Sequence, residues 1–204
     1  MSYCIYFDTE TTSLIPGQIC QLSYIIDGGG ALVAKNFFFT VDSMDPGSQR
    51  IHKLSLSKLS ELSQGRRFID DADEIHTDFS GARMIIAHNF RFDYKFMAKE
   101  FERIENPFRY KNSFCTMKHF IPHCKLGGTG RNMYKYPKLS ELGEHFGIKE
   151  DEAIGAAADI FLIDSGELHD ARYDTALLYI CVKKALNDAL ESERDKKLLD
   201  KFTT

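Results

Sequence analysis

Two carboxylates stand at the end of an apolar stretch near the N-terminus, where a buried strand would ordinarily exclude charge. Residues 3–7 are aromatic, β-branched or otherwise apolar, as in a strand covered on both faces, and Asp8 and Glu10 follow. Residues two apart in an extended chain point to the same side, so these carboxylates should meet. Repulsion and burial would raise a pKa there, and a hard divalent cation would remove both costs. The pattern predicts a metal site; the alternative is a strand end whose acids face water.

Two more positions carry groups suited to the same chemistry. Asp93 comes just after an expected strand at residues 84–87, where open α/β sheets place their ligands, although a helix-capping role is the alternative. His169 precedes a helix expected over residues 170–187, whose first turns carry Asp174. A histidine in a loop can move over a site that a helical carboxylate holds in place. A surface histidine beside a solvated helix is the alternative.

The rest of the pattern alternates strands with helices, which predicts a mixed, centrally parallel sheet with helices on both faces. Further strands are expected at residues 19–26 and 31–41, and helices at 55–64, 70–80, 93–103, 116–121 and 138–146. The segment at residues 149–168 contains a strand-like piece, Ile160–Ile163, and its role as a lid, a dimer contact or an inert hairpin stays open. We expect one domain at residues 1–185 and a charged helical tail at residues 186–204.

Composition places the chain among ordinary globular proteins. Of the 204 residues, 43% are hydrophobic and 27% are charged, which indicates neither a disordered nor a membrane protein. Apolar runs are too short to cross a bilayer and the N-terminus does not resemble a secretory signal, so we expect a cytoplasmic protein without a membrane partner. The five cysteines are odd in number and form no CxxC pair, which favours reduced thiols.

A basic window suggests a polyanionic partner. Residues 106–138 contain seven Lys and Arg and no Asp or Glu. Six aromatic residues are interleaved with them: Phe108, Tyr110, Phe114, Phe120, Tyr134 and Tyr136. Such a surface can neutralise phosphates and stack bases. A solvated basic loop whose aromatics belong to the core is the alternative.

Three segments resemble, in sequence order, the motifs of the DEDD exonuclease superfamily. They are Phe7-Asp8-Thr9-Glu10-Thr11-Thr12, then His88-Asn89-Phe90-Arg91-Phe92-Asp93, then His169 with Asp174 five positions later. The chain is most similar to the DnaQ-like branch, which includes the proofreading epsilon subunit of bacterial DNA polymerase III. A histidine five positions before the last aspartate marks the DEDDh type, and Asp170 stands where the DEDDy type has tyrosine. The resemblance implies a ribonuclease H-like fold with a mixed five-stranded sheet.

The resemblance also implies a function and a site. Asp8, Glu10, Asp93 and Asp174 would hold two Mg²⁺ or Mn²⁺ ions, and His169 would be the general base. The reaction would be 3′–5′ exonucleolytic hydrolysis of single-stranded DNA ends to nucleoside 5′-monophosphates, in proofreading or DNA repair, freestanding or with a DNA polymerase subunit. The residues implied to contact substrate are Thr9, Thr11, Leu14, His52, Asn89 and Phe92.

Several alternatives stay open at this point. An RNA-trimming 3′–5′ exoribonuclease would share the fold and the catalytic residues, because the difference lies in contacts to the 2′-hydroxyl. A catalytically silent nucleic-acid-binding module is a second alternative. The spacing of Cys115, His119, His123 and Cys124 allows a zinc site. Two residues depart from the family pattern, Ser13 in place of glycine and Gln21 in place of an acid. The oligomeric state is undetermined.

Overall fold

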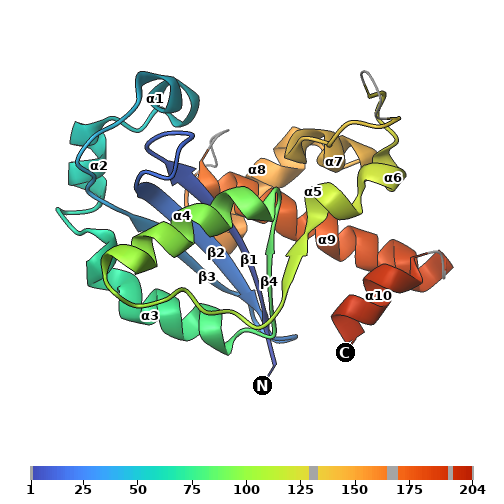
Figure 1. Ribbon diagram of the computed structural model, residues 1–204. Coiled ribbons are helices and arrows are strands. Elements are labelled where there is room, and N and C mark those ends of the chain that lie inside the picture. The colour runs from blue at the N-terminus through green and yellow to red at the C-terminus, as the bar shows by residue number, and fades with distance from the viewer. Residues whose placement is uncertain (1, 129–132, 165–169, 193–194, 204) are drawn as a thin grey trace.

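A five-stranded mixed sheet forms the centre of the protein (Figure 1). In the computed structural model, which describes residues 2–128, 133–164, 170–192 and 195–203, the strand order is β3-β2-β1-β4-β5. The strands are β1 (Cys4–Thr11), β2 (Ile19–Asp27), β3 (Val33–Phe38), β4 (Met84–Ala87) and β5 (Ser113–Cys115). Strand β2 is antiparallel to β1 and β3, whereas β1, β4 and β5 are parallel. The predicted mixed, centrally parallel sheet is confirmed.

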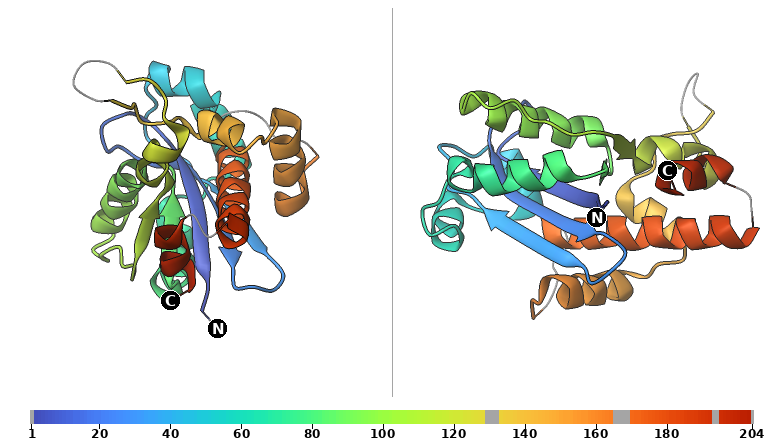
Figure 2. Two further views of the ribbon diagram at one scale, coloured as in Figure 1. Left: turned by 90° about the vertical axis from the view of Figure 1, so that its right-hand side faces the viewer. Right: turned by 90° about the horizontal axis from the view of Figure 1, so that it is seen from below.

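Helices cover both faces of this sheet (Figure 2). The helices are α1 (Pro46–His52), α2 (Leu56–Leu62), α3 (Phe68–Gly81), α4 (Phe90–Arg103), α5 (Thr116–His119), α6 (Ile121–Cys124), α7 (Leu139–His145), α8 (Glu150–Phe161), α9 (Ala171–Ser192) and α10 (Lys196–Thr203). Helices α3 and α4 lie on one face, and α9 lies on the other with α8 packed against it. None of the helices in the described ranges is both long enough and apolar enough to span a membrane.

The alternation of side chains along β1 assigns its residues to these two layers. Tyr6 belongs to the core shared with α9, whereas Phe7 belongs to the core shared with α3 and α4. Both side chains are almost completely buried, which is why the strand reads as a continuous apolar run. The same alternation places Asp8 and Glu10 on the α9 side and Thr9 on the α4 side. The strand therefore delivers two carboxylates to one face and a hydroxyl to the other.

The segment after Gly147 differs from the prediction. Residues 160–163 do not form a strand, because Ile160 and Phe161 complete α8, and Leu162 ends that helix in the left-handed conformation at φ 54°. Ala153 and Ala157 are buried one helical turn apart, and alanine has the highest helix propensity. Helical packing against α9 thus outweighs the short β-branched and aromatic run. Helix α1 was also not predicted; Asp45 caps it ahead of Pro46.

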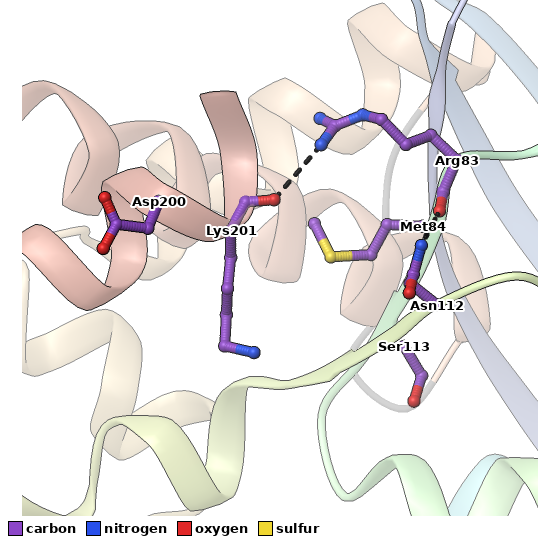
Figure 3. Close-up of a pocket in the computed structure, with 6 residues that line it drawn as sticks. All are labelled: Arg83, Met84, Asn112, Ser113, Asp200 and Lys201. Carbon is purple, nitrogen blue, oxygen red and sulfur yellow. Dashed lines mark hydrogen bonds between the residues drawn. The ribbon is translucent and has the colours of Figure 1, made fainter. Parts of the chain in front are cut away.

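The C-terminal residues pack against the sheet rather than extending from it. Helix α9 continues through the predicted boundary at residues 185/186, so the two-part division remains a prediction. In α10, Leu198 is buried, and the Phe202 ring meets Phe114 edge-on with centroids 5.4 Å apart. The Arg83 guanidinium donates hydrogen bonds to the carbonyl oxygens of Lys201 (3.1 Å) and Phe202 (3.0 Å). A cavity of about 410 Å³ lies beside this contact, between α10 and the starts of β4 and β5 (Figure 3).

Candidate active site

Three carboxylates converge at the carboxyl end of β1. One oxygen from each of Asp8, Glu10 and Asp174 lies within 4.8 Å of the other two. Asp8 and Glu10 leave β1 on the α9 side, and Asp174 comes from the first turn of α9, which packs against that face. All three side chains are only partly exposed. Residues distant in sequence therefore form one compact, oxygen-only group that is suited to a hard cation such as Mg²⁺.

The fourth predicted carboxylate approaches from the opposite side of the sheet. Asp93 lies in the first turn of α4 and is 2% exposed. It accepts a hydrogen bond from the Thr9 hydroxyl at 2.8 Å, since Thr9 points toward the α4 side of β1. Asp93 is outside the group of three whose oxygens lie within 4.8 Å of one another. Thr9 thus fixes the orientation of Asp93 at the edge of the acidic cluster.

Burial and mutual repulsion make this cluster hard to ionise. Burial, followed by the negative charges of Asp174 and Asp93, raises the pKa of Asp8 well above its usual value. Burial and the charge of Asp174 raise the pKa of Glu10 in the same direction. Burial raises the pKa of Asp93 to about 7 despite the hydrogen bond from Thr9, and burial raises the pKa of Asp174 to about 7. Without a cation, the cluster holds protons near neutral pH; a divalent cation would stabilise the ionised form.

A neighbouring acid is held in the ionised state by a different set of contacts. Burial alone would raise the pKa of Asp170, but hydrogen bonds from Arg172 lower it below the usual value. The buried Gln21 side chain, opposite Glu10 in the β1–β2 ladder, donates to Asp170 Oδ1 and Asn36 Oδ1, both at 2.8 Å. Gln21 therefore connects β2 to the start of α9, and this contact orients the turn that carries Asp174. Gln21, which stands where the family pattern has an acid, thus has a specific packing role.

The predicted general base is His169. His169 lies outside the described residues, whose nearest member is Asp170. The Asp170 carboxylate accepts a hydrogen bond from the Arg172 backbone N–H at 2.8 Å, and its carbonyl oxygen accepts one from the Asp174 N–H at 3.1 Å. The start of α9 is thus capped as its sequence indicates, and the role of His169 stays a prediction.

The loop after β1 holds two of the residues predicted to contact substrate. The Thr11 hydroxyl is buried and donates to the Ser13 carbonyl oxygen at 3.0 Å, which stabilises the turn out of the strand. Leu14 and its neighbour Ile15 are 82% and 79% exposed. Both side chains therefore extend from the loop that follows the strand carrying Asp8 and Glu10. The location agrees with a wedge role for Leu14, which remains a prediction.

The other predicted contact residues surround the same edge of the sheet. His52, at the end of α1, is buried; its Nδ1 accepts a hydrogen bond from the Leu54 N–H at 3.1 Å, and burial lowers its pKa. Asn89 precedes α4 in the left-handed conformation at φ 66°. The Phe92 ring packs 4.9 Å from that of Phe96. These residues stay predicted contacts.

A cavity next to the acidic cluster reveals residues that sequence reasoning missed. It has a volume of about 430 Å³, and its lining residues are Asp8, His88, Lys138, Leu139, Ser140, Glu150, Tyr173, Asp174 and Leu177. Lys138 contributes a positive charge from the residue before α7, and Glu150 contributes an acid from the start of α8. The sequence predicted only a helix at residues 138–146, and the role of the 149–168 segment was left open. Only the packing of α7 and α8 around α9 brings these side chains to the site.

His88 positions the segment that carries Lys138. Its Nε2 donates to the Pro137 carbonyl oxygen at 2.9 Å, and its Nδ1 lies 2.9 Å from the Thr116 hydroxyl. Burial lowers the pKa of His88, so the ring is neutral at physiological pH. A neutral ring bridging β4 to the loop before α7 fixes one wall of the cavity.

The alternative zinc set is not assembled as its spacing suggested. His119 Nε2 and His123 Nε2 lie 2.8 Å and 3.1 Å from the same Asp195 carboxylate oxygen. Among the described residues, the group of potential ligands that contains these histidines includes Asp195 and neither Cys115 nor Cys124. Because α5 and α6 are separate short helices joined at Phe120, the four residues do not share one helical face.

The strand order and the acidic cluster at the end of β1 define the ribonuclease H-like class of fold. The RNase_T family model, described as Exonuclease, matches residues 5–180. The chain therefore belongs to this exonuclease family, and the predicted DEDDh-type, DnaQ-like membership is confirmed. No curated protein is significantly similar to the chain in sequence.

Solved structures with the same fold include exonuclease I from two bacteria. The zinc-ion-bound complex of Escherichia coli exonuclease I with single-stranded DNA is 18% identical, with a TM-score of 0.72, and the alignment covers 98% of this chain and 42% of that one. The complex of the E. coli enzyme with a dT13 oligonucleotide is 18% identical, with a TM-score of 0.70 and coverages of 98% and 43%. A moderately thermophilic exonuclease I from Methylocaldum szegediense is also 18% identical, with a TM-score of 0.68 and coverages of 97% and 42%. The chain thus spans less than half the length of these proteins.

Proposed function

We propose that this chain is a metal-dependent 3′–5′ exonuclease that hydrolyses single-stranded DNA ends to nucleoside 5′-monophosphates. The observation that carries the proposal is the convergence of Asp8, Glu10 and Asp174, with Asp93 held at its edge by Thr9. Burying four acids that repel one another is destabilising, and a structural role does not require it. A site that binds cations and a phosphodiester accounts for the arrangement.

The donor set fits Mg²⁺ or Mn²⁺. Asp8, Glu10 and Asp174 offer only carboxylate oxygens, which are the preferred ligands of both ions, and Asp93 completes a set that would hold two of them. When bound, such cations lower the pKa of a coordinated water and neutralise charge that develops on the phosphate oxygens. His169 would take the proton from the attacking water, because an imidazole ordinarily titrates near neutral pH.

The remaining site residues would bind and orient the strand. The Lys138 ammonium group, in the cavity beside Asp8 and Asp174, would pair with a phosphate of the substrate. Thr9, Thr11, His52, Asn89 and Phe92 would line the terminal nucleotide.

The exposed Leu14 would insert between the last bases. Two structural neighbours, which are complexes of exonuclease I with dT13 and dA16 oligonucleotides, support single-stranded DNA as the substrate. A polymerase partner, a role in proofreading or repair and a cytoplasmic location stay predictions.

The test is digestion of matched DNA and RNA oligonucleotides labelled at the 3′ or the 5′ end, with Mg²⁺, Mn²⁺ or EDTA. We expect early release of the 3′ label as a mononucleotide, and no cleavage in EDTA or by the Asp8→Asn and His169→Ala variants. Glu191→Gln is the matched control, because it neutralises an exposed acid on α9 away from the site. Faster cleavage of RNA would assign the exoribonuclease activity instead. Binding without cleavage under any metal would favour the silent module.

A further inference from the structure

A second group of metal-ligand side chains lies far along the chain from the acidic cluster. His119 belongs to α5, His123 belongs to α6, and Asp195 immediately precedes α10. One atom from each lies within 4.8 Å of the other two. The side chains of His119 and Asp195 are 14% and 16% exposed, and that of His123 is 36% exposed. The group therefore lies in a partly buried seam between the short helices and the C-terminal helix.

The three side chains point toward one place. Both imidazole Nε2 atoms approach Asp195 Oδ2, at 2.8 Å and 3.1 Å, and the two rings stack with centroids 5.4 Å apart. Asp195 Oδ1 is turned away, since it accepts the Leu198 N–H at 3.0 Å and caps α10. Ligands about 2.0–2.2 Å from a tetrahedral Zn²⁺ lie roughly 3.3 Å from one another. The observed separations are a few tenths of an ångström shorter, so small side-chain rotations would admit the ion.

The open side of the group has room for a further ligand. A cavity of about 240 Å³ reaches His123 and Asp195, and its lining also includes His145 from α7 and Asp188 from α9. Three protein ligands with one open position is a common zinc arrangement, in which water or a fourth side chain completes the tetrahedron. Two imidazole nitrogens with one carboxylate oxygen suit Zn²⁺ better than Mg²⁺, which prefers oxygen alone.

We propose that His119, His123 and Asp195 form a Zn²⁺ site that fastens the C-terminal helix to α5 and α6. It is separate from the catalytic carboxylates and does not depend on the proposed exonuclease activity. Its ligands come from two parts of the chain that are 76 residues apart between His119 and Asp195. An ion bound to both parts stabilises their contact against local opening, because it binds only when α10 is docked.

Calorimetric titration of Zn²⁺ into the full chain tests the site directly. The titration uses the Asp8→Asn variant in excess Mg²⁺, so that Zn²⁺ binding at the acidic cluster does not add to the measured stoichiometry. We expect the wild type to bind one Zn²⁺ per chain. Removing a residue that hydrogen-bonds to a metal ligand lowers metal affinity by roughly 10- to 100-fold. Because His123 and Asp195 would be ligands themselves, His123→Ala and Asp195→Asn should each lower the affinity by more than this. Cys124→Ser is the matched control and should retain the affinity. The proposal would be overturned if the wild type did not bind Zn²⁺, or if His123→Ala and Asp195→Asn both bound it with the affinity of the wild type.

Limited trypsin digestion supplies a readout of the docked helix itself. Cleavage after Lys196 or Lys197 requires α10 to open, so Zn²⁺ should slow it in the wild type and leave it unchanged in His123→Ala. Circular dichroism in EDTA verifies that each variant is folded before the comparison. If Zn²⁺ binds at His123 but cleavage is unaffected, the fastening role is wrong. Mg²⁺-dependent cleavage of DNA, measured on the same samples, reports separately on the proposed exonuclease.

Discussion

The acidic cluster and the His119–His123–Asp195 group each bring three potential metal ligands within 4.8 Å of one another, yet their electrostatics differ. In the acidic cluster, three carboxylates repel one another and burial raises their pKa values. In the histidine group, a single carboxylate faces two rings that can each donate a hydrogen bond to it. The first group therefore needs either protons or cations, whereas the second is already satisfied without an ion. A cation should have the larger effect, on both activity and stability, at the acidic cluster.

The largest expected effect is loss of cleavage when an acid of the cluster is neutralised. Asp174→Asn keeps the shape of the side chain but weakens one cation ligand. Removing one hydrogen-bond donor to a transition state lowers kcat by roughly 10²- to 10³-fold. We expect the rate of Mg²⁺-dependent cleavage to fall by more than this in Asp174→Asn. His123→Ala should leave the rate in Mg²⁺ unchanged. The measurement is the initial rate of mononucleotide release; comparable losses in both variants would mean that the two groups do not act separately.

The second prediction concerns the pH dependence of stability without divalent cations. An aspartate with a pKa near 3.8 when unfolded and about 7 when folded binds more protons in the folded state between these values. The free energy of unfolding should therefore fall as pH rises from about 4 to 7, by up to about 1.4 kcal/mol per pH unit for each such group, and level off above.

Urea denaturation in EDTA across this range measures the slope. Adding Mg²⁺ should flatten it by stabilising the ionised cluster at neutral pH, and Asp8→Asn should reduce it in EDTA by removing one repelling charge. A free energy of unfolding that rises with pH over this range would contradict the assigned pKa shifts.

Sequence reasoning succeeded where the pattern was local and short in range. The alternation along β1 follows from a period of two, so the common side of Asp8 and Glu10 could be read directly from the chain. The order of the three motifs was sufficient for the family and for the five-stranded sheet. Helix α9 was expected because its apolar positions recur at helical spacing behind an aspartate cap.

What sequence could not predict depends on packing between distant segments. Lys138 and Glu150 reach the cavity only because α7 and α8 pack around α9, and neither position has a local signal of function. Asp195 lies 76 residues after His119, so spacing suggested nearby cysteines in its place. Residues 160–161 were misread as strand because a four-residue apolar run has no decisive periodicity.

The third prediction concerns Gln21, which connects the sheet to the start of α9. Gln21→Leu removes one donor to Asp170 and one to Asn36 while keeping the side chain a similar size, at an expected cost of about 1–3 kcal/mol. Because the contact orients the turn that carries Asp174, kcat should fall more than KM rises. A purely structural contact would lower stability without this difference.

Gln21→Glu is the informative companion variant. When protonated, glutamic acid can donate to Asp170, and when ionised it repels Asp170. Its stability relative to the wild type should therefore be highest at acidic pH and decrease as pH rises. A pH-independent difference between the two proteins would show that the Gln21 contact with Asp170 is not important in solution.

The smallest expected effect is at Arg83, which anchors α10 from the opposite end to Asp195. Arg83→Ala removes the donors to the Lys201 and Phe202 carbonyl oxygens. Because these bonds are near the surface, we expect a loss at the lower end of the roughly 0.5–1.5 kcal/mol range for a typical hydrogen bond, faster tryptic cleavage in α10 and unchanged DNA cleavage. Arg67→Ala, which removes an exposed arginine paired with Asp42, is the control.

If Zn²⁺ fastens α10 at Asp195, it should restore the protection lost in Arg83→Ala, since a bound ion adds stability to the docked state whichever other contact is missing. Failure of Zn²⁺ to do so would leave hydrogen bonds and the Phe202–Phe114 contact as the attachments of this helix.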